Sequence, residues 1–151
     1  MSKISDVYTA IIAEMEALYP TKIRLHNPYE LTENAEMVCK NSWGIAVEDA
    51  SRENLEYCNL SILRTFKAIF LRQFVTLSSK EDGFDAITAL LLEDQQTFLN
   101  AFYSPDEIGQ QGIIERIDFT TISGVNQLVS GEKKYLFSEV TFNILISEAI
   151  I

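Results

Sequence analysis

The chain has 151 residues, of which 47% are hydrophobic and 23% charged, and its formal net charge is −10. This balance is typical of a single folded domain, here residues 1–151, and argues against an intrinsically disordered chain. So acidic a surface repels phosphates and argues against sequence-specific binding of DNA or RNA, although a channel that lets DNA pass freely would also be acidic.

The composition gives no sign of a cofactor, a metal site or a membrane span. The two cysteines, Cys39 and Cys58, lack the spacing of metal ligands, and no apolar stretch approaches the ~20 residues of a membrane helix. The first residues also lack the apolar segment of a signal peptide. We therefore expect a protein made in a reducing cytoplasm, with both thiols free.

The first predicted element is an amphipathic helix. Apolar residues recur at helical spacing over residues 4–19, and Pro20 supplies a stop signal. Short strands are expected at residues 23–25 and 43–47, and the polar segment between them is predicted to form a loop with a turn at Asn27–Pro28.

The next prediction is one very long strand, at residues 60–77, after a charged stretch at 48–59 that reads as a loop or an extended excursion. Eighteen extended residues would reach about 60 Å, more than a compact domain of this length spans. The strand must therefore bend at a bulge or project from its domain. Both of its faces are largely apolar. Three explanations of the second apolar face stay open. Another element of the chain covers it, a neighbouring subunit covers it, or the strand reverses its register at a bulge.

A second helix is predicted where helical spacing returns, at residues 81–103. Asp82 or Asp85 is a candidate for capping its start. Asp94 falls on the apolar stripe, where the helix could break into two pieces.

The last predicted elements are strands at residues 113–119 and 134–146, joined by a long loop at 120–131. The order of elements predicts an α+β domain. It has a mostly antiparallel, twisted sheet, one very long central strand, and two main helices packed on one face.

Catalytic chemistry finds no support in the sequence. His26 is the single histidine, which argues against triads and multi-histidine metal sites. Phosphate-binding loops, dinucleotide fingerprints and nucleophile elbows are missing. We expect no enzyme and no cofactor.

Two arginines, Arg64 and Arg72, interrupt one apolar face of the long strand. Each needs a partner, because an unpaired buried charge is costly. Either they reach solvent near a sheet edge, or they pair with carboxylates of an adjacent subunit, such as Glu48, Asp49 or Glu53. The sequence leaves both alternatives open.

In element order and length, nearly the whole chain resembles the tail terminator (tail-completion) proteins of long-tailed bacteriophages. The matching segments are the first helix ending at Tyr19-Pro20, His26-Asn27-Pro28-Tyr29, Ser42-Trp43-Gly44-Ile45-Ala46-Val47, Arg64-Thr65-Phe66-Lys67-Ala68-Ile69-Phe70-Leu71 with the helix after it, Ile117-Asp118-Phe119, Ser123-Gly124-Val125, and the last strand through Val140-Thr141-Phe142.

The resemblance implies a structural virion protein that forms a hexameric ring. Such a ring caps the head-proximal end of the tail tube, stops tube polymerisation and offers the capsid neck a docking surface, while DNA passes through its centre. The implied partners are further copies of the chain, the tail tube protein and a neck or head-completion protein, with no membrane involved. The expected subunit interface comprises Arg64, Arg72, Glu48, Asp49, Arg52 and Glu53. The expected tube or neck docking surface comprises Gly124, Val125, Asn126, Gln127, Lys133 and Lys134.

Two alternatives stay open at this stage. Another neck or head–tail joining subunit would share the size, the acidity and the ring. A monomeric ligand-binding α+β module would use the two apolar strand faces to line a pocket.

Overall fold

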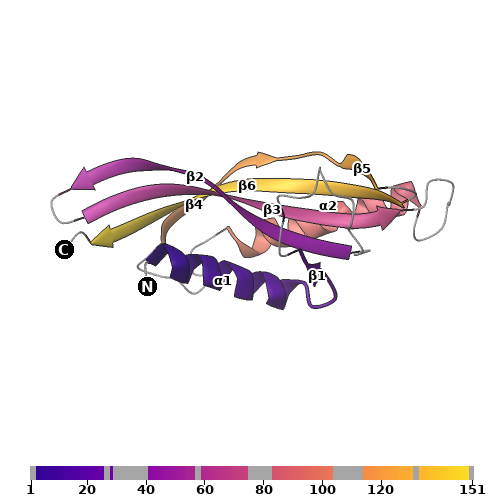
Figure 1. Ribbon diagram of the computed structural model, residues 1–151, viewed down its shortest axis with the longest axis horizontal. Helices are drawn as coiled ribbons and strands as arrows, with labels where there is room; N and C mark the ends of the chain where they lie inside the picture. The colour runs from indigo at the N-terminus through magenta and orange to yellow at the C-terminus, as the bar shows by residue number, and fades with distance from the viewer. Residues whose placement is uncertain are drawn as a thin grey trace.

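The computed structural model describes residues 3–25, 28, 41–56, 59–74, 83–103, 114–130 and 133–149. Within these ranges the chain forms two helices and a six-stranded sheet (Figure 1). The elements are α1 (Lys3–Leu18), β1 (Ile23–Arg24), β2 (Asn41–Glu56), β3 (Asn59–Phe74), α2 (Phe84–Ala101), β4 (Ile114–Ile122), β5 (Asn126–Ser130) and β6 (Lys133–Ala149).

The sheet has the order β1-β2-β3-β6-β4, and β5 pairs with β6 further along the border that β4 occupies. Every pairing is antiparallel except that of β1 with β2. The predicted α+β class, with a mostly antiparallel sheet and a very long central strand, is therefore confirmed.

The long strand stays regular instead of bending. β3 pairs with β6 over its whole length with no shift of register. The register shifts lie in other strands, at two places in β2, which pairs with β3, and at two in β4, which pairs with β6. A flip of register within β3 is therefore excluded for residues 59–74, and the end of the predicted run, 75–77, lies outside the described residues.

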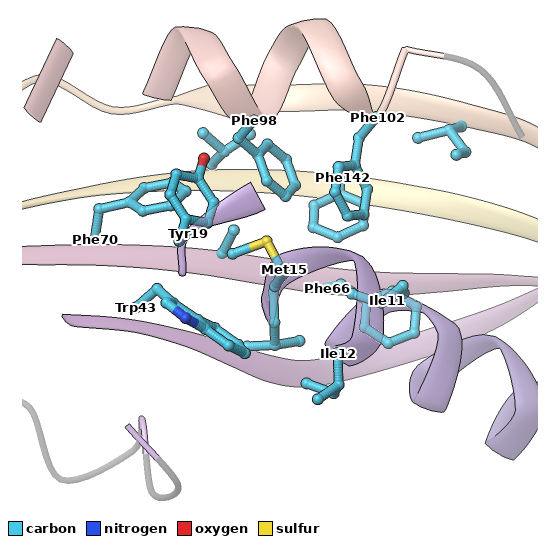
Figure 2. Packing of buried hydrophobic residues seen from close by; sticks show 14 of the residues in the cluster. Ile11, Ile12, Met15, Tyr19, Trp43, Phe66, Phe70, Phe98, Phe102 and Phe142 are labelled. Carbon is cyan, nitrogen blue, oxygen red and sulfur yellow. The ribbon is translucent and has the colours of Figure 1, made fainter. Parts of the chain in front are cut away.

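Both helices pack on one face of the sheet, where the main core forms. α1 contributes Ile11 and Met15, and α2 contributes Phe98 and Phe102. Phe98 stacks on Phe102 with ring centroids 4.3 Å apart and meets Phe142 of β6 at 5.2 Å (Figure 2). This aromatic contact ties α2 to the middle of the sheet.

The second face of β3 is covered within the chain over the half that carries Ile69 and Leu71. These two side chains are buried together with Ala46 and Tyr135, and Leu25, Leu128 and Phe137 pack against them. Next to this cluster, a Cβ on Gly44 would lie 3.2 Å from the Cβ of Pro28 and 3.3 Å from that of Leu25. Glycine thus allows the segment after β1 to lie close on β2.

The segment 48–59, predicted as a loop or an extended excursion, and the segment 120–131, predicted as a loop, consist mostly of strand where they are described. β2 continues through most of the charged stretch 48–59, as far as Glu56, and pairs with β3. The segment 120–131 consists of the end of β4, a break at residues 123–125, and β5, which forms a hairpin with β6. Hydrogen bonds to a long neighbouring strand outweigh the weak local preference of polar, charged residues for strands.

The second helix also differs from its prediction. α2 runs without a break through Asp94, and its N-cap is Gly83, which makes no side-chain capping bond. Asp82 lies outside the described residues, and Asp85 is in the first turn. The first helix and the strand at 114–122 lie where the sequence predicts them.

Three strands project beyond the helices and β4. β4 begins at Ile114, which is opposite Ile146, and β6 continues past that point to Ala149. Residues 54–56, 59–61 and 147–149 are paired there as a three-stranded tip, which Figure 1 shows beyond the start of α1. We call this tip the arm.

Candidate functional site

Arg72 has a complete partner inside the chain. Its Nε donates to Oδ2 of Asp94 at 2.8 Å, and its Nη2 donates to Oδ1 at 3.0 Å. Asp94 comes from α2 and is buried, so this is a bidentate ion pair between the inner face of β3 and the helix above it. The paired fork geometry is the strongest that an arginine and a carboxylate form.

Two residues after α1 complete the same cluster. The Nζ of Lys22 lies 2.8 Å from Oδ2 of Asp94 and also donates to the side-chain oxygen of Asn41. The hydroxyl of Tyr19 donates to the backbone oxygen of Asp94 at 2.7 Å. The cluster therefore joins the segment after α1, the start of β2, the end of β3 and the middle of α2.

Burial perturbs both groups that follow α1. Burial lowers the pKa of Lys22 to about 8, and attraction to Asp94 offsets only part of that effect. Burial, and then the charge of Asp94, raises the pKa of Tyr19 far above its usual range. Tyr19 thus remains a neutral hydrogen-bond donor at any pH at which the protein folds.

The Asp94 cluster corrects two expectations. Arg72 is not an unpaired arginine waiting for another subunit, because Asp94 neutralises it within the chain. Asp94 does not break α2, because the apolar stripe faces a strand that presents Arg72. The sequence carried a signal for this pair, because Asp94 is an acid on an apolar helix stripe and Arg72 is one of two bases on an apolar strand face.

Arg64, eight residues earlier on the same face of β3, has no such partner. Its Nη1 makes one long bond, 3.4 Å, to the backbone oxygen of Glu48. Its Nε is buried and has no hydrogen-bond partner. No carboxylate of the described residues forms an ion pair with it. The local sequence of the two arginines is similar, and only the structure separates them.

Arg64 lines a small recess at the root of the arm. The recess has a volume of about 40 Å³, and its other lining residues are Ile4 from the first turn of α1, Ile62 from β3 and Ile146 from β6. A space of this size holds two or three waters or one small polar group. No sequence pattern indicates the three isoleucines as a group, because they come from distant segments.

The remaining expected interface residues lie on β2. Glu48 is half-buried on the face opposite the helices, where Lys67 bridges it, at 3.5 Å, to Glu139, at 3.3 Å. Burial alone would lower the pKa of Lys67, but attraction to the two carboxylates outweighs it and raises the pKa. Asp49 is exposed at a register shift of β2. The side chains of Arg52 and Glu53 lie outside the described part of β2.

The expected docking residues lie at the opposite end of the sheet from the arm. Gly124 and Val125 occupy the break between β4 and β5, and Asn126 and Gln127 are exposed at the start of β5. Lys134 is paired with Val129 in the hairpin of β5 and β6, and the side chain of Lys133 lies outside the described residues. The structure therefore brings these residues together along one border and the hairpin next to it.

Ser123 fixes the break between the two border strands. Its backbone NH donates to the oxygen of Glu139 at 2.9 Å, and its Oγ accepts from the NH of Glu139 at 2.8 Å. The side-chain amide of Gln95 donates to the Ser123 oxygen at 3.0 Å. The segment is a bonded irregularity in the sheet border, which limits uncontrolled pairing with other strands.

A broader open groove lies beside α1. It has a volume of about 310 Å³ and is lined by Tyr8, Thr9, Ile12, Ala13, Glu16 and Arg24. The guanidinium of Arg24 donates to the Tyr8 hydroxyl at 3.2 Å and lies 5.8 Å from the centre of the Trp43 ring. These contacts give Arg24 a packing role at the border strand β1.

The described ranges contain neither a candidate metal site nor a helix that could span a membrane. No group of three His, Cys, Asp or Glu residues among them could hold a metal ion. Neither helix in the described part is long and apolar enough to cross a membrane. No protein-family model matches the chain, and no curated protein matches it.

Proposed function

We propose that this chain is the subunit of a hexameric ring that caps the head-proximal end of a bacteriophage tail tube. The ring stops polymerisation of the tube, presents the docking surface for the capsid neck, and lets DNA pass through its centre. The protein acts as a structural part of the virion and catalyses no reaction. The proposal starts from the resemblance of nearly the whole chain to tail terminator proteins, and the α+β fold agrees with it.

The observation that carries the proposal is the arm. Three paired strands continue past α1 and β4, so a part of the sheet extends beyond the layer of helices that covers the rest (Figure 1). Sheet that projects from a domain gains stability when a neighbouring chain covers it or pairs with it. A monomeric module has no evident use for such an extension.

Two regions of the sheet suit two different contacts. A closed ring uses heterologous contacts, in which one surface of a subunit meets a different surface of the next. We assign the root of the arm, with Arg64, Glu48 and Asp49, to contacts between subunits. We assign the β4–β5 border from Gly124 to Gln127, and the hairpin after it, to the tube or the neck. Along β6 the first region is level with residues 142–144 and the second with residues 134–139.

The charge of the chain supports passage of DNA. The 22 acidic residues exceed the 12 basic ones, and lining a channel with acidic groups withholds the phosphate contacts that would hold DNA in place. An assembled ring of this composition would repel DNA from its walls without sequence preference.

The test is to add the purified chain to growing tail tubes. Tubes that receive the chain should stop elongating when more tube protein is supplied, and electron microscopy should show a ring at one tube end. An acidic protein of similar mass serves as the control. Tubes that continue to grow at saturating concentrations of the chain would contradict the proposal.

The same experiment separates the nearest alternative. Another neck or head–tail joining subunit would bind the finished assembly without stopping growth of the tube. The groove beside α1 is the one observation that favours a ligand-binding module, because its volume is at the lower end of the range for ligand pockets. A ligand-binding module would use the second apolar face of β3 to line its pocket. Over the half that carries Ile69 and Leu71, that face is instead covered by Leu25, Leu128 and Phe137.

A further inference from the structure

Arg64 carries a charge that the described part of the chain leaves uncompensated. Its Nε is shielded from solvent without an acceptor, and its Nη1 has only a long bond to a backbone oxygen. A guanidinium that is half-buried without a carboxylate costs stability, and no ion pair among the described residues offsets that cost. Arg72, on the same face of the same strand, differs because its Nε and Nη2 both donate to the carboxylate of Asp94.

We propose that the recess at Arg64 is a binding site for a side-chain carboxylate that a second copy of this chain inserts at the root of the arm. This inference rests on the proposed ring, for which it supplies one specific contact between subunits. The site consists of the guanidinium of Arg64 and the three isoleucines that line the recess.

The chemistry of the recess fits a carboxylate. A guanidinium binds both oxygens of one carboxylate through two parallel N–H donors, and because Nε of Arg64 is shielded from solvent, the two Nη atoms are the donors left for an incoming carboxylate. The space of about 40 Å³ accepts a group of that size, and a carboxylate that displaces water from it would meet Arg64 among three apolar side chains, where a lower effective dielectric constant strengthens an ion pair. Ile4 places the recess beside the first turn of α1, and the positive end of a helix also favours an anion.

Neither Glu48 nor Asp49 of the second copy supplies the carboxylate. Glu48 is already bridged by Lys67, and Asp49 lies next to Ala50, the residue of β2 that is paired with Arg64. A contact between Arg64 and Asp49 of another copy would therefore join like surfaces and close a two-fold dimer. A ring with more than two subunits needs a donor elsewhere on the surface, and the chain has 22 acidic residues.

The first measurement compares the association of four full-length chains by light scattering over a concentration series. Arg64→Gln should raise the concentration at half-assembly by at least about tenfold, because the inserted carboxylate loses its partner. Arg64→Lys, which keeps the charge without the fork, should have a smaller effect. Arg116→Gln, which removes an exposed arginine of β4, should assemble like the wild type, and circular dichroism verifies the fold of each variant.

The second measurement identifies the donor. A carbodiimide joins the amine of the Arg64→Lys variant to a carboxylate in contact with it, with formation of an amide and loss of the carbodiimide as a urea. A mixture of 15N-labelled and unlabelled chains should give a cross-linked peptide that contains both isotopes. Cross-links at position 64 that are confined to one chain would overturn the inference.

The outcomes separate this inference from the proposed function. If Arg64→Gln assembles and caps tubes at the same concentrations as the wild type, the inference is wrong and the capping function stands. If assembly depends on Arg64 but tubes continue to grow, the contact is established and the capping function fails. If rings form only on tube ends, the same variants are compared by the concentration needed to cap. A wild-type chain that is monomeric at millimolar concentration and on tubes overturns the inference.

Discussion

Arg64 and Arg72 lie on the same face of the same strand, eight residues apart, and have opposite environments. Arg72 is enclosed by Asp94, with Lys22 and Tyr19 bonded to the same residue. Arg64 lies in a recess at the root of the arm, where isoleucines and a distant backbone oxygen are its neighbours among the described residues. A fully paired charge fixes the position of a helix on its sheet, whereas a charge without a carboxylate in the described part of the chain is the one for which we propose a partner in a second copy.

The largest loss of stability is expected when the carboxylate at the centre of the Asp94 cluster is removed. Asp94→Ala leaves Arg72 and Lys22 buried without a counter-charge, and loss of one partner of a buried pair costs about 3–5 kcal/mol. Urea or thermal denaturation measures the loss. Glu93→Ala, an exposed neighbour of the same charge in the same helix, is the matched control and should change stability by less than about 0.5 kcal/mol. Equal stability of the two variants would remove the structural role of the cluster.

The pH dependence of the free energy of unfolding should reveal the lowered pKa of Lys22. Its pKa is lowered to about 8 in the folded chain, from an ordinary 10.5, so between these values the unfolded chain binds more protons than the folded one. Stability should therefore rise from pH 8 towards pH 10 by about 1–3 kcal/mol, an effect absent below pH 7. The raised pKa of Tyr19 opposes this only above about pH 10, where tyrosines of the unfolded chain ionise.

Urea denaturation at pH 7, 8, 9 and 10 measures the slope, and Lys22→Met should abolish it. A wild-type stability that falls steadily through this window would show that Asp94 holds the lysine charged, and that attraction outweighs burial.

The smallest effect on the single chain is expected at Arg64. Arg64→Leu removes a charge that has no carboxylate partner among the described residues, so the free energy of unfolding of the monomer should stay within about 1 kcal/mol of the wild-type value, and the expected change is an increase. Denaturation at a concentration below assembly measures it. A loss above about 2 kcal/mol would mean that Arg64 is held within the chain, and the contrast with Arg72 would disappear.

Sequence patterns predicted the elements whose periodicity is strong. α1, the long strand β3 and the strand β6 have apolar positions that match one period over many residues, and they lie where the patterns place them. The order of these elements was enough for the α+β class. β5 and the outer half of β2 were missed, because polar strands at a border draw their stability from hydrogen bonds to a neighbour that the local sequence does not reveal.

The candidate site was predicted in part. The sequence singled out Arg64 and Arg72 as charges that need partners, and it noticed Asp94 on an apolar stripe. It could not pair Arg72 with Asp94, because their contact depends on how α2 crosses β3. Lys22 gave no signal at all, since a lysine after a helix reads as an exposed residue until the fold buries it.

The sequence by itself determined which face of α1, α2 and β6 turns inward, because that choice depends on the spacing of apolar residues along one element. Only the tertiary structure decided which of two similar arginines is neutralised. Arg72 lies under α2, where Asp94 is within reach, and Arg64 lies beside the first turn of α1, where Ile4 is the side chain that faces it. Partners that are distant in the chain meet only when helices and sheet are packed, so the charge left open at the arm could not be read from either strand or helix alone.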